Sequence, residues 1–230
     1  MHRDALLATV LAEPDADLPR LVYADFLEEF GDALDHARAE FIRAQVELSA
    51  GVPDPARRAA IEAREKVLLA LHAAAWLKPL RARGEPLQNP GTHGLFRRGF
   101  VELVWMPAAI YLTKAHRLFA RAPVRELRLT RVKVPEVGPL LAHPATRSLA
   151  ALDLSDHYIG DDAARAVAAA PTLHFQALRL RNSNLTDAGA EALAGVPAGW
   201  SPRVVDVTGN GIGPGGRRAL AARYPGAVVG

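Results

Sequence analysis

The feature that most constrains the fold is a short triplet of apolar, any and apolar residue that recurs along the second half of the chain. Successive triplets begin 26, 25, 26 and 27 residues apart. A single triplet carries no information, but five at a nearly fixed period are typical of a repeat architecture in which each repeat contributes one strand. The triplets are Val101-Glu102-Leu103, Leu127-Arg128-Leu129, Leu152-Asp153-Leu154, Leu178-Arg179-Leu180 and Val205-Asp206-Val207.

The residues after the later triplets indicate the rest of each repeat. A turn, one further aliphatic residue and an alanine-rich segment follow each of the last three triplets, as expected for a strand, a turn and a helix. The pattern resembles leucine-rich repeats of the ribonuclease-inhibitor kind, with parallel strands on the concave side and helices on the convex side. The position that this family fills with asparagine is occupied in successive turns by Val132, His157, Ser183 and Asn210. The expected fold class is α/β, a helical N-terminal module followed by a leucine-rich-repeat solenoid of about five turns.

The central residue of each triplet is expected to project onto the concave surface, because alternate side chains of a strand point to opposite faces. This column alternates in sign from Glu102 to Asp206. Neighbouring strands lie about 4.8 Å apart, so the charges are expected largely to neutralise one another. Aromatic and arginine side chains near the open edge are candidate anchors for a partner protein, although Trp105 fits packing beneath the preceding segment equally well. The predicted partner-binding residues are Phe100, Glu102, Trp105, Arg128, Asp153, Arg179, Arg181 and Asp206.

The first hundred residues have a helical pattern. Apolar residues recur three and four positions apart, and Asp54 followed by Pro55 is a typical helix start. The expected helices span residues 3–12, 18–30, 35–49 and 55–78. Residues 81–94 have the Pro, Gly and Asn content of a loop. The predicted domains are a helical module over 1–80, a linker over 81–94 and the solenoid over 95–230.

Two stretches of the helical region carry a second resemblance. The sequence LPRLVYADFLEEFGD followed by RAEFIRAQVEL is similar to the repeat-companion domain, a short N-terminal module of bacterial proteins that often carry leucine-rich repeats behind it. Phe26 stands where that family commonly has Trp, which keeps an aromatic residue at the position. The resemblance implies an architecture and an intracellular, adaptor-like role, and it implies no catalytic activity or ligand.

Charged residues are dense in the same stretch, and they admit a structural, a metal-binding or a catalytic interpretation. Paired carboxylates can do acid–base chemistry when their pKa values are pushed apart, but no nucleophile motif, phosphate-binding glycine loop or HExxH motif accompanies them. His36 and Glu40 lie four residues apart and could share a metal, yet two such ligands often occur by chance. The favoured interpretation is a structural polar network between two packed helices, formed by Tyr23, Asp25, Glu29, Arg38 and Arg43. No catalytic residue, metal or cofactor is therefore expected.

The charge of the chain is unevenly distributed, which leaves two functions open. Residues 1–50 carry a net charge of −7, residues 51–150 of +10 and residues 151–230 of zero. The basic middle could contact nucleic acid, or it could pack against the acidic start and neutralise it, which is favoured. The expected function is a non-catalytic protein–protein interaction or scaffold module, with nucleic-acid binding through the basic 81–133 region as the alternative.

Composition and terminal pattern narrow the function classes further. The chain has no cysteine, which excludes disulfides, thiolate zinc sites and thiol nucleophiles. No apolar run approaches the roughly 20 residues of a membrane span, and the N-terminus lacks the pattern of a signal peptide. We therefore expect a cytoplasmic protein that binds a protein partner and no membrane.

Overall fold

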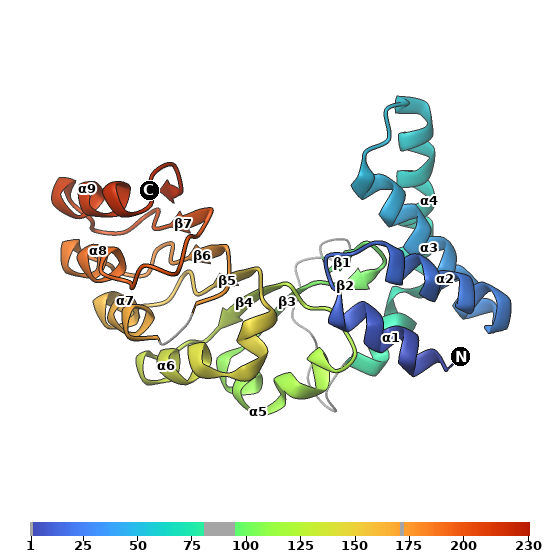
Figure 1. Ribbon diagram of the computed structural model, residues 1–230, viewed down its shortest axis with the longest axis horizontal. Coiled ribbons are helices and arrows are strands. Elements are labelled where there is room, and N and C mark those ends of the chain that lie inside the picture. The colour runs from blue at the N-terminus through green and yellow to red at the C-terminus, as the bar shows by residue number, and fades with distance from the viewer. Residues whose placement is uncertain (1, 81–94, 171–172) are drawn as a thin grey trace. The chain divides into compact units, whose positions relative to one another are not determined.

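The computed structural model describes residues 2–80, 95–170 and 173–230, and the chain forms two compact units (Figure 1). Unit 1 comprises Met1–Val104 with Arg117–Val124, and unit 2 comprises Trp105–His116 with Arg125–Gly230. The predicted linker over 81–94 lies outside the described residues. Residues 95–104, which the sequence pattern assigns to the solenoid, belong to unit 1 instead.

The helices of unit 1 follow the predicted segments closely. They are α1 (Arg3–Ala12), α2 (Leu18–Phe30), α3 (Ala33–Ala50) and α4 (Pro55–Leu77), followed by the 3-10 helix η1 (Lys78–Leu80). Asp32 begins α3 and Asp54 begins α4, because each side chain accepts a hydrogen bond from a backbone N–H of the first turn, at 2.9 and 3.0 Å. These N–H groups have no partner within the helix, so the caps fix where the helices start.

A short hairpin packs against these helices. Its strands are β1 (Phe96–Arg97) and β2 (Phe100–Val101), which pair antiparallel. Gly99 between them has a φ of +82°, a conformation that favours glycine. Its N–H donates to Gln45 Oε1 at 2.7 Å, and a Cβ at Gly99 would fall 2.3 Å from Cγ1 of Ile42. The hairpin therefore lies directly against α3.

Unit 2 is built of strands that alternate with helices. The strands form one sheet in the order β3-β4-β5-β6-β7-β8, and the pairs from β4 to β8 are parallel. Figure 1 shows α6 to α9 side by side along one side of this sheet, and neighbouring helices are in contact. The boundary with unit 1 falls within the first two elements, because residues 103–104 and 117–119 belong to unit 1. The elements are β3 (Leu103–Pro107), α5 (Ala108–Phe119), β4 (Glu126–Thr130), α6 (Val134–Ala142), η3 (Pro144–Ser148), β5 (Ala151–Asp153), α7 (Gly160–Ala169), β6 (Ala177–Arg179), α8 (Asp187–Ala194), β7 (Val204–Asp206), α9 (Pro214–Arg223) and β8 (Val228–Val229). The predicted α/β architecture is confirmed.

The turns of the solenoid are held by side chains that bond to the backbone. Asn210 Oδ1 accepts hydrogen bonds from the N–H groups of Ser183 and Leu185, both at 2.9 Å. Its Nδ2 donates to the carbonyls of Leu180 and Val207, both at 2.7 Å. One amide thus satisfies four backbone groups in two neighbouring turns, which would otherwise need other partners.

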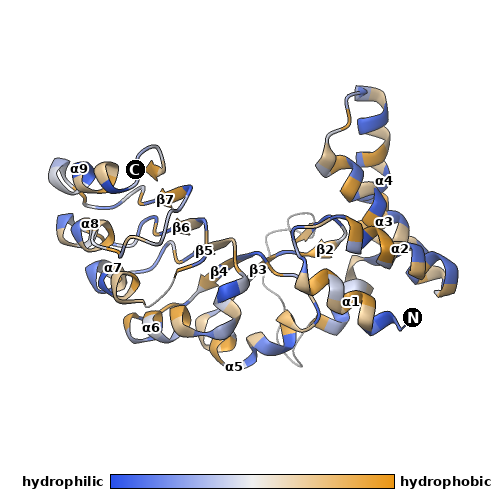
Figure 2. Cartoon of the chain, in the orientation of Figure 1, coloured by the Kyte–Doolittle hydropathy of each residue, from blue (hydrophilic) through white to orange (hydrophobic). Residues whose placement is uncertain are grey.

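Each helix mixes apolar and hydrophilic residues around its surface. Figure 2 shows both kinds on α7, α8 and α9, and α7 buries Ala163, Ala164 and Val167. Small residues at these positions let stacked helices approach closely. Within the three described ranges, no helix is long and apolar enough to cross a membrane.

Candidate functional site

The register of the sheet aligns the predicted charged column. Asp153 on β5 is aligned with Arg128 on one side and with Arg179 on the other. Arg179 is in turn aligned with Asp206 on β7. The apolar residues on either side of each are buried, so the column faces away from the core. We call this surface the sheet face, which comprises Trp105, Arg128, Asp153, Arg179, Arg181 and Asp206.

Two arginines of the sheet face form ion pairs. Arg128 Nη2 lies 2.5 Å from Asp156 Oδ2, and Arg128 Nε lies 3.9 Å from Asp153 Oδ2. Arg181 Nε lies 3.9 Å from Asp206 Oδ2. Sequence reasoning missed Asp156, although it follows Asp153 by only three residues and the turn after β5 returns it to Arg128. Such partly exposed pairs add at most about 1 kcal/mol of stability, but they do orient the side chains.

Arg179 differs from these two arginines. Although aspartates flank it in register, it forms no ion pair within 4.0 Å in the part of the chain that the structure describes. Both aspartates accept hydrogen bonds from their own turns: Asp153 from the Ser155 N–H at 2.9 Å, and Asp206 from the Thr208 hydroxyl at 2.6 Å. The expected mutual neutralisation of the column is therefore incomplete at Arg179.

Trp105 lies on the sheet face rather than beneath the preceding segment. It stands on β3 between the buried residues Val104 and Met106 and stays partly exposed. The guanidinium carbon of Arg128 lies 4.5 Å from the centre of its indole ring. A cation over an aromatic face is attracted by the ring quadrupole, so this contact holds both side chains in one arrangement.

Phe100 and Glu102 are not on this surface, and their assignment to it is wrong. Both belong to unit 1, where they are 4% and 3% exposed. Phe100 packs against Tyr23, with ring centres 5.6 Å apart. The triplet Val101-Glu102-Leu103 matches the repeat pattern, but the strand that joins the sheet begins at Leu103, so Trp105 takes the place expected for Glu102.

Glu102 instead forms a buried ion pair with Arg20, a residue that sequence reasoning missed. Arg20 Nη2 lies 2.7 Å from Glu102 Oε1, and Arg98 Nη2 lies 3.0 Å from the same oxygen. Burial lowers the pKa of Arg20 and raises the pKa of Glu102. A signal was present, because Arg20 precedes the buried Tyr23 and Leu27 by three and seven residues and so shares their helix face.

The predicted polar network is only partly assembled. Arg43 on α3 bonds to Asp25 on α2 at 2.8 Å, as expected, but its second partner is Glu28 rather than Glu29, which is exposed. Arg38, the other arginine predicted for this network, is not part of it. Arg38 contacts aromatic rings and forms no ion pair within the described ranges.

Tyr23 has the environment expected of it. Its ring is buried, and its hydroxyl accepts a hydrogen bond from Arg3 Nε at 3.2 Å. Arg3 also bonds to both oxygens of Asp35, at 2.9 and 2.7 Å. The network thus ties α1 to α2 and α3 through Arg3, which the sequence analysis did not identify.

The metal interpretation of His36 and Glu40 gains no support from the geometry. Both oxygens of Glu40 accept hydrogen bonds from Arg64, at 2.6 and 2.7 Å. These bonds hold the pKa of the Glu40 carboxyl below its usual range. Among the described residues, no group of three or more histidine and carboxylate side chains could hold a metal ion.

Some cations of the basic 81–133 region donate hydrogen bonds to the backbone, others are exposed, and Arg121 does both. Arg81 and Arg83 lie outside the described residues. The arginines that donate to backbone carbonyls are Arg98, Arg121 and Arg125. The exposed cations of the region are Arg97, Arg117, Arg121, Arg131 and Lys133. Nucleic-acid binding through this region stays a prediction.

Comparison with known proteins identifies the C-terminal part. Residues 147–168, 173–194 and 203–221 match the family described as Leucine Rich repeat. A search of curated proteins found no match. Each matched segment covers one strand of the sheet and all or most of the helix that follows it. The strand–helix pairs are β5 with α7, β6 with α8 and β7 with α9. The C-terminal part of the chain therefore carries leucine-rich repeats, which are generally protein-interaction modules and typically non-catalytic.

Proposed function

We propose that the chain is a non-catalytic interaction module that binds a partner protein through the sheet face of its repeats. The observation that supports this most is Arg179, the central cation of that face, which has no ion pair among the described residues. Trp105 and Arg128 lie on the same face, toward the β3 end of the sheet. Tryptophan and arginine are enriched among residues that dominate interface energies, and solenoids use such extended surfaces for binding.

The two ends of the sheet face would contribute differently. Arg179 can pair with a carboxylate of the partner through two parallel hydrogen bonds. Trp105 offers apolar area, and its contact with Arg128 already restrains both side chains, so less side-chain freedom is lost on binding. The partner expected is therefore a protein surface that sets an acidic side chain beside an apolar patch.

The charges of the sheet face favour protein over nucleic acid. Asp153, Asp156 and Asp206 lie among its arginines. Nucleic-acid binding needs several phosphates neutralised by clustered cations, and interspersed carboxylates repel phosphates. Mixed charge of both signs suits a protein surface, where it fixes register and partner choice.

Affinity capture from the native cell with matched variants tests the proposal. The bait is the intact chain, compared with the double variant Trp105→Ala and Arg179→Ala. Arg218→Ala is the matched control, because Arg218 is an exposed arginine on α9. A third bait, Leu18→Ser with Phe30→Ser, alters two side chains of α2 that are 71% and 66% exposed.

The proposal predicts that specific protein partners are lost from the Trp105/Arg179 variant and retained by the other two. Loss from the α2 variant alone would assign recognition to the helical unit and contradict the proposal. Capture of nucleic acid that all baits retain, with a steep loss on adding salt, would favour the basic 81–133 region instead.

A further inference from the structure

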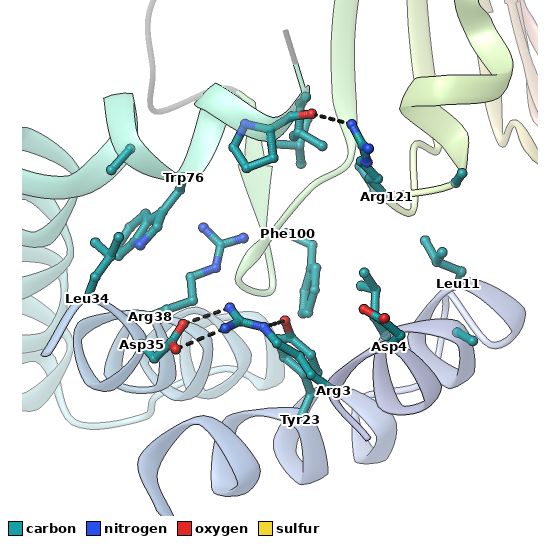
Figure 3. A pocket seen from close by; sticks show the side chains of 18 residues that line it. Arg3, Asp4, Leu11, Tyr23, Leu34, Asp35, Arg38, Trp76, Phe100 and Arg121 are labelled. Carbon is teal, nitrogen blue, oxygen red and sulfur yellow. Dashed lines mark hydrogen bonds and ion pairs between the residues drawn. The ribbon is translucent and has the colours of Figure 1, made fainter. Parts of the chain in front are cut away.

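Unit 1 contains a pocket that is separate from the sheet face. Its volume is about 550 Å³, within the range of roughly 300–1,000 Å³ that is usual for small-molecule sites. Figure 3 shows 18 lining residues, all of them from unit 1. They come from α1, α2, α3, α4, η1, β2 and the segment 117–124.

Arg38 is the distinctive group of this pocket. Figure 3 shows its side chain between Trp76 and Phe100, with no bond to another residue drawn. Its guanidinium carbon lies 4.8 Å from the ring centre of Trp76 and 5.5 Å from that of Phe100. The Nη1 atom is buried without a hydrogen-bond partner, and no carboxylate of the described residues pairs with Arg38. A cation with unmet N–H groups is costly to bury.

The charge of Arg38 persists at neutral pH. Burial lowers the pKa of the guanidinium to about 9, so it remains protonated at pH 7. Aromatic faces compensate part of the lost hydration, but they accept no strong hydrogen bond. The site therefore holds one uncompensated positive charge beside an open cavity.

The other charged residues of the pocket either form hydrogen bonds with protein groups or are exposed to solvent. Arg3 pairs with Asp35 through two hydrogen bonds, and Arg121 donates to the carbonyl of Pro79 at 2.9 Å. Asp4 is exposed on α1. The lining thus carries three arginines and two aspartates, a net charge of +1, which matches a ligand with one negative charge better than a ligand with several.

The remaining wall is apolar. Leu7, Ala8 and Leu11 of α1 line the pocket together with Phe100 and Val101 of β2. We propose that this pocket binds a small organic acid with one carboxylate on an apolar body, the carboxylate pairing with Arg38 and the body packing against α1. A planar carboxylate matches the fork of N–H donors on a guanidinium. This site is independent of the proposed sheet-face binding.

Calorimetric titration of the full chain with 4-phenylbutyrate tests the proposal, with 4-phenylbutyramide as its uncharged counterpart. Arg38→Met removes the charge and keeps an unbranched apolar side chain against the rings. Ala8→Trp fills the apolar wall from an exposed position of α1. Arg64→Met is the control, since Arg64 pairs with Glu40 and does not line this pocket.

We expect the acid to bind, and Arg38→Met and the amide each to weaken binding by about 10- to 100-fold, as for the loss of a hydrogen bond to a charged group. Ala8→Trp should weaken it at least as much, and Arg64→Met should leave it unchanged. Urea unfolding confirms that each variant is folded, and Arg38→Met is expected to be no less stable, because it removes an unpaired charge. Absence of binding at millimolar acid, or equal binding of the acid to the parent and Arg38→Met, would overturn the proposal.

Discussion

Arg20 and Glu102 form an ion pair 2.7 Å long, with side chains that are 0% and 5% exposed. The two residues lie 82 positions apart in the chain and join α2 to the segment that follows β2. Arg20 also donates to the carbonyl of Pro14 at 2.6 Å and to that of Arg98 at 3.1 Å. This guanidinium is therefore a buried polar link between the helices and the hairpin of unit 1, in addition to the bond between Gln45 and Gly99.

Removing the carboxylate should destabilise the protein strongly. Glu102→Gln leaves Arg20 buried with its charge uncompensated, and such changes cost about 3–5 kcal/mol. Glu40→Gln breaks an exposed pair with Arg64 and should cost at most about 1 kcal/mol. Urea unfolding of both variants measures the difference, and equal free energies of unfolding would show that the Arg20–Glu102 pair is not structurally important.

Substitution of Gly99 in the hairpin should lower the free energy of unfolding by more than its positive φ alone explains. Gly99 and Gly51 have similar φ values, +82° and +89°, but only Gly99 has neighbours where a Cβ would stand. Both Gly→Ala changes incur backbone strain of about 1–3 kcal/mol. Gly99→Ala should cost about 1–3 kcal/mol more, because its Cβ collides with Ile42 on α3. Equal costs in denaturant unfolding would contradict the close packing of hairpin and helix.

The repeat period predicts most of the solenoid correctly because it is a property of the whole sequence rather than of one residue. The aligned positions of Arg128, Asp153, Arg179 and Asp206 follow from triplets that repeat every 25 to 27 residues. The prediction from the first triplet is wrong because three residues are too few to distinguish a strand of the sheet from the edge of a hairpin. Glu102 fits the apolar-any-apolar pattern yet is buried in the other unit.

Side-chain partners were harder to predict than strand register. The bond between Asp25 and Arg43 follows from the packing of two adjacent helices, but the choice of Glu28 over Glu29 depends on helix rotation, which the spacing leaves open. Long-range partners such as Arg20 and Glu102 depend on tertiary contacts between segments far apart in the chain. Arg38 was expected in the polar network because acidic side chains of one helix were predicted to face basic side chains of the next, but its side chain lies among aromatic rings instead.

The amide of Asn210 should be important for the last repeats. Asn210→Ala removes four hydrogen bonds to backbone groups of Leu180, Ser183, Leu185 and Val207. Leaving buried polar groups unpaired costs about 1–3 kcal/mol each where water cannot replace the partner, so we expect a loss of about 2–4 kcal/mol in the free energy of unfolding. Glu191→Ala, an exposed change on α8, is the control. A loss no larger than that of the control would contradict this role.

The stability contributed by Asp161 should depend on pH. Burial alone raises the pKa of this carboxyl, but hydrogen bonds from Thr186 and the Gly189 N–H outweigh that effect and hold the pKa below its usual range. A depressed pKa contributes stability above the unfolded-state value of about 3.9, and this contribution is lost as pH falls through the lower folded-state pKa. The gap in unfolding free energy between the parent and Asp161→Asn should therefore be largest near pH 6 and shrink toward pH 3. With Asp162→Asn as the control, a gap that is constant with pH would contradict the charge-dependent role.

Site-specific photo-crosslinking tests binding through the sheet face most directly. A photoreactive residue replaces Thr208, which is exposed two positions beyond Asp206, or Arg218 on α9 as the comparison site. On irradiation in the native cell, we predict crosslinks from position 208 to a distinct partner protein, lost when Arg179→Ala is added, and none to that protein from position 218. Crosslinks to the same proteins from both positions, or none from position 208, would contradict protein binding through this face.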